Sequence, residues 1–527
     1  MSHSPRNGAW VLLGALGLGV LLVGVELMVT AVALPSIIAD LADWTRLREA
    51  SWIVNGYLVA YIAVMPLAGR AADRYSLASL YGLSLGVFAI GSLLSGAAQS
   101  LEWLIAARVV QGLGAGAIFP LATAAAGHLF EGQTRARAIG VIGALSFLGM
   151  AAGPVIGAAV LSLEVPAGIL TAPAWRWVFY LPAPLAILSG LFLWAAAPAW
   201  PREKAAGRLD LSGATLFTAG LALALVALTM FGAKDVPDPT LLALAGAIML
   251  ALALFRFGRA KDPFIDPRMF RDRTFSGAVL MSLITGYALT TAIIGAAVFV
   301  DRVRYAGPAE QQLALGALAG AMAIGALGAG FLVRPMGVMW PSVAGLLAEV
   351  GGLLVLSRAD SSTDLAVLCV ALAVFGLGFG VTVTARTSGA LEALGRKAFG
   401  VGSAVLTVAR MIGMGTGLAA LTVLGSNRIE ALSVVLTDPV ARDAVLPPTL
   451  HGRPLEDYLV VDALERWASG QAAQILAWTF LVAAAVTTVA ILPTLAMRNR
   501  PGTHGRSAEG EDVGNVIEEA SRAGLAI

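Results

Sequence analysis

A single carboxylate interrupts the first apolar stretch of the chain, GVLLVGVELMVTAVALP (residues 19–35). Glu26 has aliphatic and glycine residues on both sides, and the apolar stretch extends from Trp10 to about Leu34. This stretch is long enough for a helix to cross about 30 Å of hydrocarbon, and it is longer than the apolar core of a cleaved signal peptide. A charge at the centre of a bilayer costs roughly 2.5–3.5 kcal/mol on insertion scales, so its retention indicates a function.

The composition of the whole chain is that of a polytopic membrane protein. Of the 527 residues, 58% are hydrophobic and only 13% are charged, and the mean hydropathy is +0.81. A soluble domain is about one quarter charged. Windows of about 19 residues predict an all-α fold of fourteen membrane-spanning helices, near residues 10–34, 51–69, 77–97, 103–127, 138–163, 175–197, 211–231, 240–257, 275–300, 311–333, 339–357, 365–385, 400–425 and 470–495.

The distribution of Arg and Lys predicts the orientation and the domains. If both termini are cytoplasmic, most of these residues fall on the cytoplasmic side, in agreement with the positive-inside rule. Similar Gly- and Arg-containing turns follow span 2 and span 10, which indicates the internal duplication typical of secondary transporters. We expect two six-helix bundles at residues 1–200 and 263–500, with two linker spans between them at 201–262. We also expect a long outer loop within the second bundle at 426–469 and a disordered cytoplasmic tail at 501–527.

Four charged residues fall inside predicted spans: Glu26 in span 1, Arg108 in span 4, Glu349 in span 11 and Arg410 in span 13. At 1.5 Å per residue, Arg108 and Glu26 lie at depths that allow contact if their spans are neighbours. One interpretation is a structural ion pair that joins two helices. The other is a proton-coupling site, because desolvation favours the protonated carboxyl and a nearby guanidinium favours the carboxylate.

No pattern in the chain is typical of an enzyme or a metal protein. The G-x-S-x-G match GLSLG (82–86) lies inside a predicted span and not at a strand-to-helix turn. The four histidines are not spaced as metal ligands, the single Cys369 excludes an intrachain disulfide, and no Gly-Lys dipeptide is present for a phosphate loop. We therefore expect no enzymatic activity, no metal, no cofactor other than a proton gradient, and no nucleic-acid partner.

Two motifs in the first part of the chain resemble those of the fourteen-span drug:proton antiporters of the major facilitator superfamily. ELMVTAVALP (26–35) is similar to the first-span motif of that family, with Glu26 at the position of its Asp. GRAADR (69–74) resembles the family's loop motif after span 2, with Gly69, Asp73 and Arg74 at matching positions. The three residues from Ser76 stand where the family has Gly and two basic residues.

Further motifs extend this resemblance. RVVQG (108–112) resembles the span-4 motif whose Arg is implicated in proton transfer, and GMAAGPVIGA (149–158) resembles the antiporter motif of span 5. The latter contains Gly149, Gly153, Pro154 and Gly157, and glycine at every fourth position also makes a bare helix face for close packing. Matches at the start of span 6 and at the borders of the linker spans are WRWVFYLPAP (175–184), RLDLSG (208–213) and PFIDPRMFRDRTF (263–275).

The resemblance implies two six-helix bundles that rock about a central cavity, open alternately to either side of the plasma membrane. It implies a monomeric, proton-coupled exporter of hydrophobic or amphipathic compounds such as drugs, with membrane lipids, protons and the substrate as its partners. A transport-inactive membrane receptor or scaffold is the remaining alternative.

A narrower resemblance gives a second candidate substrate. YIAVMPLAGRAADR (61–74) and VARMIGMGTG (408–417) resemble the actinobacterial branch that includes mycobacterial triacylglyceride exporters. That branch has an acid in span 1 and an Arg in the eleventh core span, here Glu26 and Arg410. Its span-5 carboxylate is absent, since Phe147 stands near that place. This resemblance implies export of lipids such as triacylglycerides, with a periplasmic lipoprotein as a further partner.

The outer part of the second bundle supports two more expectations. LEDYLVVDALERWAS (455–469) places apolar residues on one helical face, which predicts an outward, amphipathic continuation of the last span. This segment is either a cap over the mouth of the pore or a guide for an apolar substrate that leaves the membrane. Glu164 after span 5 and Arg428 after span 13 are candidates for an outer latch.

Overall fold

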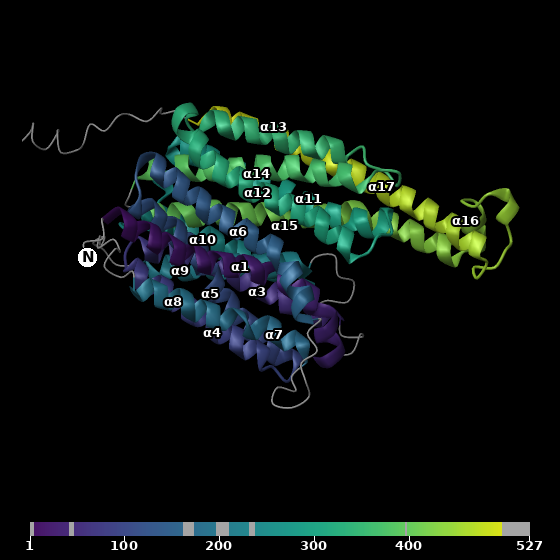
Figure 1. Cartoon of the computed structure of the whole chain (residues 1–527), viewed down its shortest axis with the longest axis horizontal. Coiled ribbons are helices and arrows are strands. Elements are labelled where there is room, and N and C mark those ends of the chain that lie inside the picture. Colours follow the sequence, from purple (N-terminus) through teal and green to yellow (C-terminus); the bar gives the residue numbers. More distant parts are fainter. Residues whose placement is uncertain are drawn as a thin grey trace, which may run out of the picture.

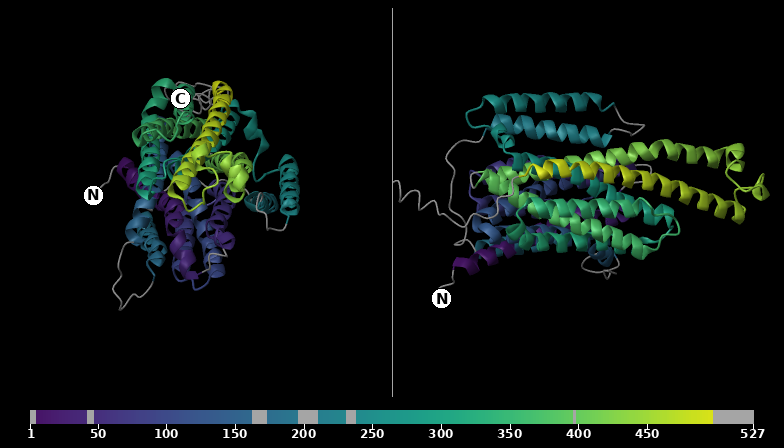
Figure 2. Two further views of the ribbon diagram at one scale, coloured as in Figure 1. Left: turned by 90° about the vertical axis from the view of Figure 1, so that its right-hand side faces the viewer. Right: turned by 90° about the horizontal axis from the view of Figure 1, so that it is seen from above.

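The computed structural model describes residues 5–41, 47–161, 173–195, 210–230, 238–395 and 398–497. Regular structure within these ranges is helical throughout, as the sequence predicts. The helices lie along the long axis of the molecule, and α1 begins at the end where the last long helix, α17, finishes (Figures 1 and 2). We call this end the terminal face and the other end the opposite face. The predicted boundary near residue 200 and the predicted tail 501–527 lie outside the described residues.

The first bundle contains the first six predicted spans. Its third and fourth spanning helices begin with serine caps, because the hydroxyls of Ser76 and Ser100 accept from the backbone N–H of Ser79 and Trp103. The sixth predicted span is divided in two before Pro182, which has no N–H to continue the hydrogen-bond ladder. The helices are α1 (Pro5–Leu41), α2 (Leu47–Ala50), α3 (Trp52–Ala72), α4 (Leu77–Gly96), α5 (Leu101–Leu129), α6 (Gly132–Leu161), α7 (Ala174–Tyr180) and α8 (Pro182–Ala195).

Two linker helices, α9 (Leu211–Met230) and α10 (Thr240–Arg259), form a hairpin at the edge of the molecule against α3 (Figure 2). Asp210 and Arg256 form an ion pair of 2.8 Å at the base of the hairpin. Thirteen of the described helices are long and apolar enough to cross a membrane, whereas α9 contributes only a shorter apolar stretch. The predicted total of fourteen spans is therefore not established by length and composition.

The second bundle begins after a short 3₁₀ helix and contains the remaining long helices. Asp272 and Asp364 cap two of them through their carboxylates. The elements are η3 (Pro267–Arg271), α11 (Arg273–Val298), the π-helical η4 (Phe299–Val303), α12 (Pro308–Met336), α13 (Met339–Leu356), α14 (Leu365–Leu394), α15 (Phe399–Thr437), α16 (Pro439–Asp443), η6 (Pro448–Leu450), α17 (Tyr458–Val489) and α18 (Ile491–Leu495).

Much of the segment predicted as a long outer loop, 426–469, is helical. Helix α15 continues to Thr437 and α17 already begins at Tyr458, so that both helices project beyond the others at the opposite face, with α16 near their tip (Figure 1). The predicted outward continuation of the last span is confirmed from Tyr458 onward. Val460 and Leu464 are buried in a small cluster between the projecting helices, whereas Leu459, predicted on the same face, is exposed.

The glycine face of α6 packs against α1. A Cβ on Gly149 would collide with the carbonyl oxygen of Leu21 and lie 3.0 Å from the Cα of Gly24. A Cβ on Gly153 would lie 2.8 Å from the carbonyl oxygen of Val25. Helix α6 runs through Pro154 without interruption. The two helices thus approach each other backbone to backbone over this length.

We expect Gly149→Ala to lower the thermal stability of the purified protein, because the added methyl forces α1 and α6 apart. Overpacking of this kind costs about 1–3 kcal/mol. Gly190→Ala in α8 is the matched control, since nothing lies within 4 Å of a Cβ built there. Equal melting temperatures for the two variants would contradict the close contact.

Candidate functional site

The two bundles contact each other at the terminal face. Helix α3 packs against α15, and α6 packs against α12. A Cβ on Gly69 would collide with the carbonyl oxygen of Gly400, and a Cβ on Gly330 would lie 2.8 Å from the Cα of Arg137. Farther along, the rings of Phe147 and Phe379 meet edge to face at 6.0 Å. The contacts near Gly69 and Gly330 are made by the ends of these helices that lie nearest the terminal face.

Asp73 connects the bundles directly. Its carboxylate accepts hydrogen bonds from the backbone N–H groups of Gly400 at 2.7 Å and Val401 at 3.0 Å, in the first turn of α15. The helix dipole favours a negative charge at that position. The other charged residues of the loop motif, Arg70 and Arg74, both pair with Asp262, which follows the linker hairpin.

Burial raises the pKa of Asp73 to about 7. Hydrogen bonds from the Val401 and Gly400 N–H groups and the charges of Arg70 and Arg74 act in the opposite direction. The contact between bundles therefore holds a proton on Asp73 more tightly than water-exposed surroundings would, since the usual pKa is 3.8.

A buried ion pair lies inside the first bundle. Glu26 on α1 and Arg108 on α5 form a direct ion pair, and their side chains are 0% and 1% exposed. Thr30 donates a hydrogen bond of 3.2 Å to the Oε1 of Glu26, and the Oε2 has no hydrogen-bond partner. The structure thus brings together the two residues whose depths suggested contact. Their role in proton coupling stays a prediction.

Additional groups that the sequence analysis did not single out hold Arg108. Its Nη1 donates to Gln111 at 2.5 Å and its Nε donates to the carbonyl of Ile53 at 3.2 Å. The guanidinium also lies 4.2 Å from the centre of the Tyr57 ring. Gln111 is three residues after Arg108 in the quoted RVVQG motif, so helical spacing would have placed it on the same face.

The second bundle contains a separate charged cluster. Glu349 on α13 is 0% exposed and its Oε1 accepts from the hydroxyl of Thr382 at 2.9 Å. It interacts electrostatically with Arg386 on α14, whose Nη1 donates to Thr285 at 2.6 Å. Arg386 is 2% exposed. The predicted span 365–385 ends one residue before Arg386, whereas α14 continues to Leu394.

Arg410 on α15 faces the first bundle. Its guanidinium lies 5.7 Å from the centre of the Phe119 ring on α5, and it also interacts with Tyr61 on α3. Its Nε has no hydrogen-bond partner. Of the four sequence-predicted charges, Glu26 and Arg108 share one cluster, and Glu349 and Arg410 each lie near Arg386 in the other. The predicted latch cannot be placed, since Glu164 and the side chain of Arg428 lie outside the described residues.

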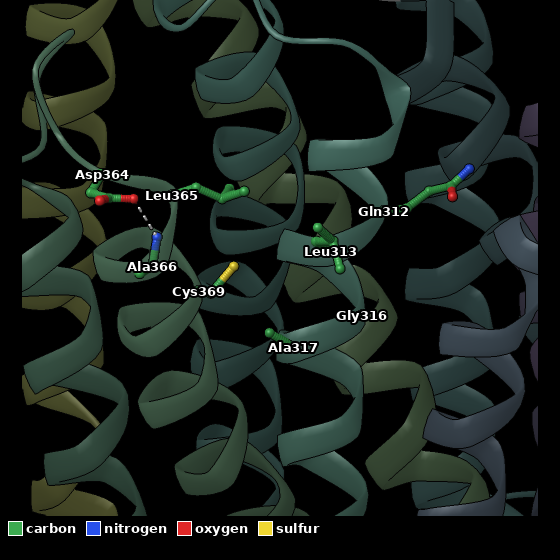
Figure 3. Close-up of a pocket in the computed structure, with 8 residues that line it drawn as sticks. All are labelled: Gln312, Leu313, Gly316, Ala317, Asp364, Leu365, Ala366 and Cys369. Atoms are coloured by element: carbon green, nitrogen blue, oxygen red, sulfur yellow. Dashed lines mark hydrogen bonds between the residues drawn. The ribbon is translucent and has the colours of Figure 1, made fainter.

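A third feature is an apolar groove at the start of α12 and α14. It encloses about 650 Å³, and Leu313, Gly316, Ala317 and Cys369 line it (Figure 3). Asp364 at its edge is engaged as a helix cap with the N–H of Ala366. The groove holds none of the four charged residues, and its lining is suited to contact with hydrocarbon chains.

The structure has two helical bundles with charges buried in their interiors, which is the arrangement that the sequence motifs predict. The profile of the Major Facilitator Superfamily matches residues 16–418. The chain belongs to the Major Facilitator Superfamily. The predicted non-enzymatic transporter function is thereby confirmed at the level of the superfamily.

Several relatives within the superfamily are mycobacterial proteins. A triacylglyceride transporter of Mycolicibacterium smegmatis is 32% identical over 465 residues, which covers 85% of this chain and 82% of the relative. The triacylglyceride transporter of Mycobacterium tuberculosis is 31% identical over 460 residues, with 84% and 87% covered. A triacylglyceride transporter of Mycobacteroides abscessus is 30% identical over 467 residues, with 84% and 88% covered.

Solved structures of other superfamily members share the fold. The human organic anion transporter MFSD10 superposes with a TM-score of 0.60 at 16% identity, over 93% of this chain and 99% of the other. A proton:xylose symporter superposes with a TM-score of 0.59 at 13% identity, over 92% and 95%. At these identities the likeness concerns the fold alone.

We expect Arg108→Gln to destabilise the transporter strongly, because it leaves the Glu26 carboxylate buried without its cation. Breaking a buried pair in this way costs about 3–5 kcal/mol. The double variant Glu26→Gln/Arg108→Gln removes both charges and should recover part of the loss in a thermal-unfolding assay. Arg302→Gln, at an exposed ion pair, is the control. An unchanged melting temperature for Arg108→Gln would show that the pair does not form.

The raised pKa of Asp73 predicts a pH dependence of the terminal-face contact. Because the pKa of Asp73 is higher in the contact than in water, the protonated carboxyl favours the contact. This contribution to the free energy of contact is complete below about pH 4, declines as the pH rises, and is gone above about pH 7. Labels at Ser79 and Glu392, one on each bundle, report the separation by distance measurement. We expect the fraction of open molecules to rise over this range, and to be flat in Asp73→Asn. A pH response that persists unchanged in Asp73→Asn would assign it to another group.

Proposed function

We propose that this transporter moves an apolar or amphipathic lipid to the outer face of the plasma membrane in exchange for protons. The observation that carries the proposal is 30–32% identity to mycobacterial triacylglyceride transporters over more than four fifths of the chain. The apolar groove in Figure 3 and the projecting helices α15 and α17 are suited to a substrate that stays in contact with hydrocarbon.

We propose further that both termini are cytoplasmic, because Arg and Lys are enriched on that side of the predicted topology. In this orientation the described contacts at the terminal face close the cytoplasmic side of the transporter. The lipid would then enter from the inner leaflet after the contacts at Asp73 and Gly69 separate. A periplasmic lipoprotein that accepts the lipid is the proposed partner of a monomeric transporter.

Glu26 is the proposed proton-binding residue. Protonation of its carboxyl removes the charge that attracts Arg108. The cation is not stranded when this happens, because Gln111, the Ile53 carbonyl and the Tyr57 ring all remain in contact with it. The pair can therefore open and close during a transport cycle without leaving a bare charge in a low-dielectric interior. Glu349 is the second candidate carboxylate, and it too is completely buried.

Proteoliposomes with a fluorescent triacylglyceride test the proposal. Appearance of the label in the outer-facing leaflet, where a membrane-impermeant reductant quenches it, measures transport under an imposed proton gradient. We expect Glu26→Gln to abolish gradient-driven transport and Glu26→Asp to retain part of it. Glu392→Gln, at an exposed glutamate near the end of α14, is the control.

Two results would contradict this assignment. Transport that is unaffected by collapse of the gradient would remove proton coupling, and full activity of Glu26→Gln would move the proton site to Glu349. Efflux of a cationic dye, without movement of the triacylglyceride, would favour the drug-export alternative that the span-5 motif suggested.

A further inference from the structure

A small space between the two bundles is lined by two cations and several hydroxyls. Arg386, Thr387, Ser403, Thr407 and Arg410 contribute from α14 and α15, with Ser282 from α11. Phe119 is the residue that lines it from the first bundle. The space is distinct from the Glu26 cluster, and its described lining contains no carboxylate.

The two guanidiniums are not neutralised by direct ion pairs. Among the described residues, no carboxylate oxygen lies within 4.0 Å of Arg386 or Arg410, although both side chains are at least nine-tenths buried. The positive charge of Arg410 raises the cost of burying the charge of Arg386, and the negative charge of Glu349 offsets only that of Arg386. The Nε of Arg410 and the hydroxyl of Ser282 have no hydrogen-bond partner. Buried donors and cations without partners are strongly unfavourable, so this closed arrangement is costly at the two guanidiniums, and an anion that reaches them in a more open arrangement is strongly favoured.

We propose that Arg386 and Arg410 bind the anionic headgroup, a phosphate or a carboxylate, of an amphipathic lipid. This inference rests on the proposed function as a lipid exporter and adds anionic amphipathic lipids to the neutral lipid used in the transport assay. Guanidinium matches both anions through paired N–H donors in one plane. The hydroxyls of Ser282, Ser403 and Thr407 supply further donors around the remaining oxygens.

The location of the site couples headgroup binding to the position of the bundles. In this structure the space encloses about 10 Å³, which is room for about one water molecule. Phe119 covers Arg410 from the opposing bundle. When the bundles separate at the terminal face, Phe119 moves away from Arg410 and the site opens. Closure reduces the space again, so an anion that entered there is released toward the other side.

Binding of two lipids that differ only in the headgroup tests the inference. Fluorescent phosphatidic acid and diacylglycerol with the same acyl chains are titrated against the full-length transporter in nanodiscs of phosphatidylcholine. We expect at least about tenfold tighter binding of phosphatidic acid. Arg386→Gln and Arg410→Gln should each reduce this preference, and the double variant should abolish it while its affinity for diacylglycerol stays the same.

Matched variants separate the site from general effects of charge and folding. Arg358→Gln removes an exposed Arg of the same bundle and should leave the preference intact. Arg386→Lys retains the charge without the planar donors and should keep part of the preference. Glu349→Gln removes the anion that competes for Arg386 and should tighten binding of phosphatidic acid. Gly69→Ala, whose Cβ would collide with the carbonyl oxygen of Gly400 and so weaken the terminal-face contact, should do the same.

Three outcomes would overturn the inference. These are equal affinities for the two lipids, a preference that persists in the double Arg variant, and competition by inorganic phosphate at the same concentration as phosphatidic acid, which would assign the site to a free anion. The binding assay needs no gradient, so it is independent of the transport assay. An intact headgroup preference together with no lipid movement would overturn the proposed function alone.

Discussion

Charge held away from water is the constraint on which this structure depends. The first bundle neutralises its buried charge internally, since Glu26 faces Arg108 and Gln111 completes the set of partners. The second bundle does so only in part, because Glu349 lies near Arg386 while Arg410 points toward the other bundle. The buried charges of the first bundle are therefore paired within it, whereas the second bundle places positive charge at the interface between the two bundles.

The interface between the two bundles is suited to separation. Its closest approaches are made by backbone, at Gly69 against Gly400 and at Gly330 against Arg137. Aromatic side chains add further contacts across it, such as the ring of Phe399 against that of His128. Among its polar contacts, Arg334 of α12 donates to Gln133 of α6, and the carboxylate of Asp73 accepts from two N–H groups of α15. A contact of this kind has a defined closed geometry and loses few interactions when it opens, because both the carboxylate and the N–H groups can return to water.

Hydropathy was sufficient to predict the fold class. The rise of 1.5 Å per residue placed Glu26 and Arg108 at depths that allow contact, and the packing of α1 beside α5 brings them together. Arg386 was missed because hydropathy falls after Ala385, although the helix continues without a breaker until Gly395, where φ is +71°. The same limit hid the projecting end of α15, whereas the projecting end of α17 was predicted from the apolar face of residues 455–469. Pairwise contacts across bundles, such as Phe119 with Arg410, depend on tertiary packing and carry no local sequence signature.

The partly compensated charges of Arg386 and Arg410 also make the conformational change sensitive to the membrane potential. Arg386 and Arg410 belong to one bundle, so any rocking motion that changes their depth moves positive charge through the field across the membrane. A full crossing is worth roughly 2.3 kcal/mol per charge at 100 mV, so a tenth of that path is worth about 0.2 kcal/mol for the net positive charge that remains after Glu349 offsets Arg386. A resting potential that is negative inside then favours the conformation in which these residues lie nearer the cytoplasm, and it biases the cycle even in steps where no proton moves.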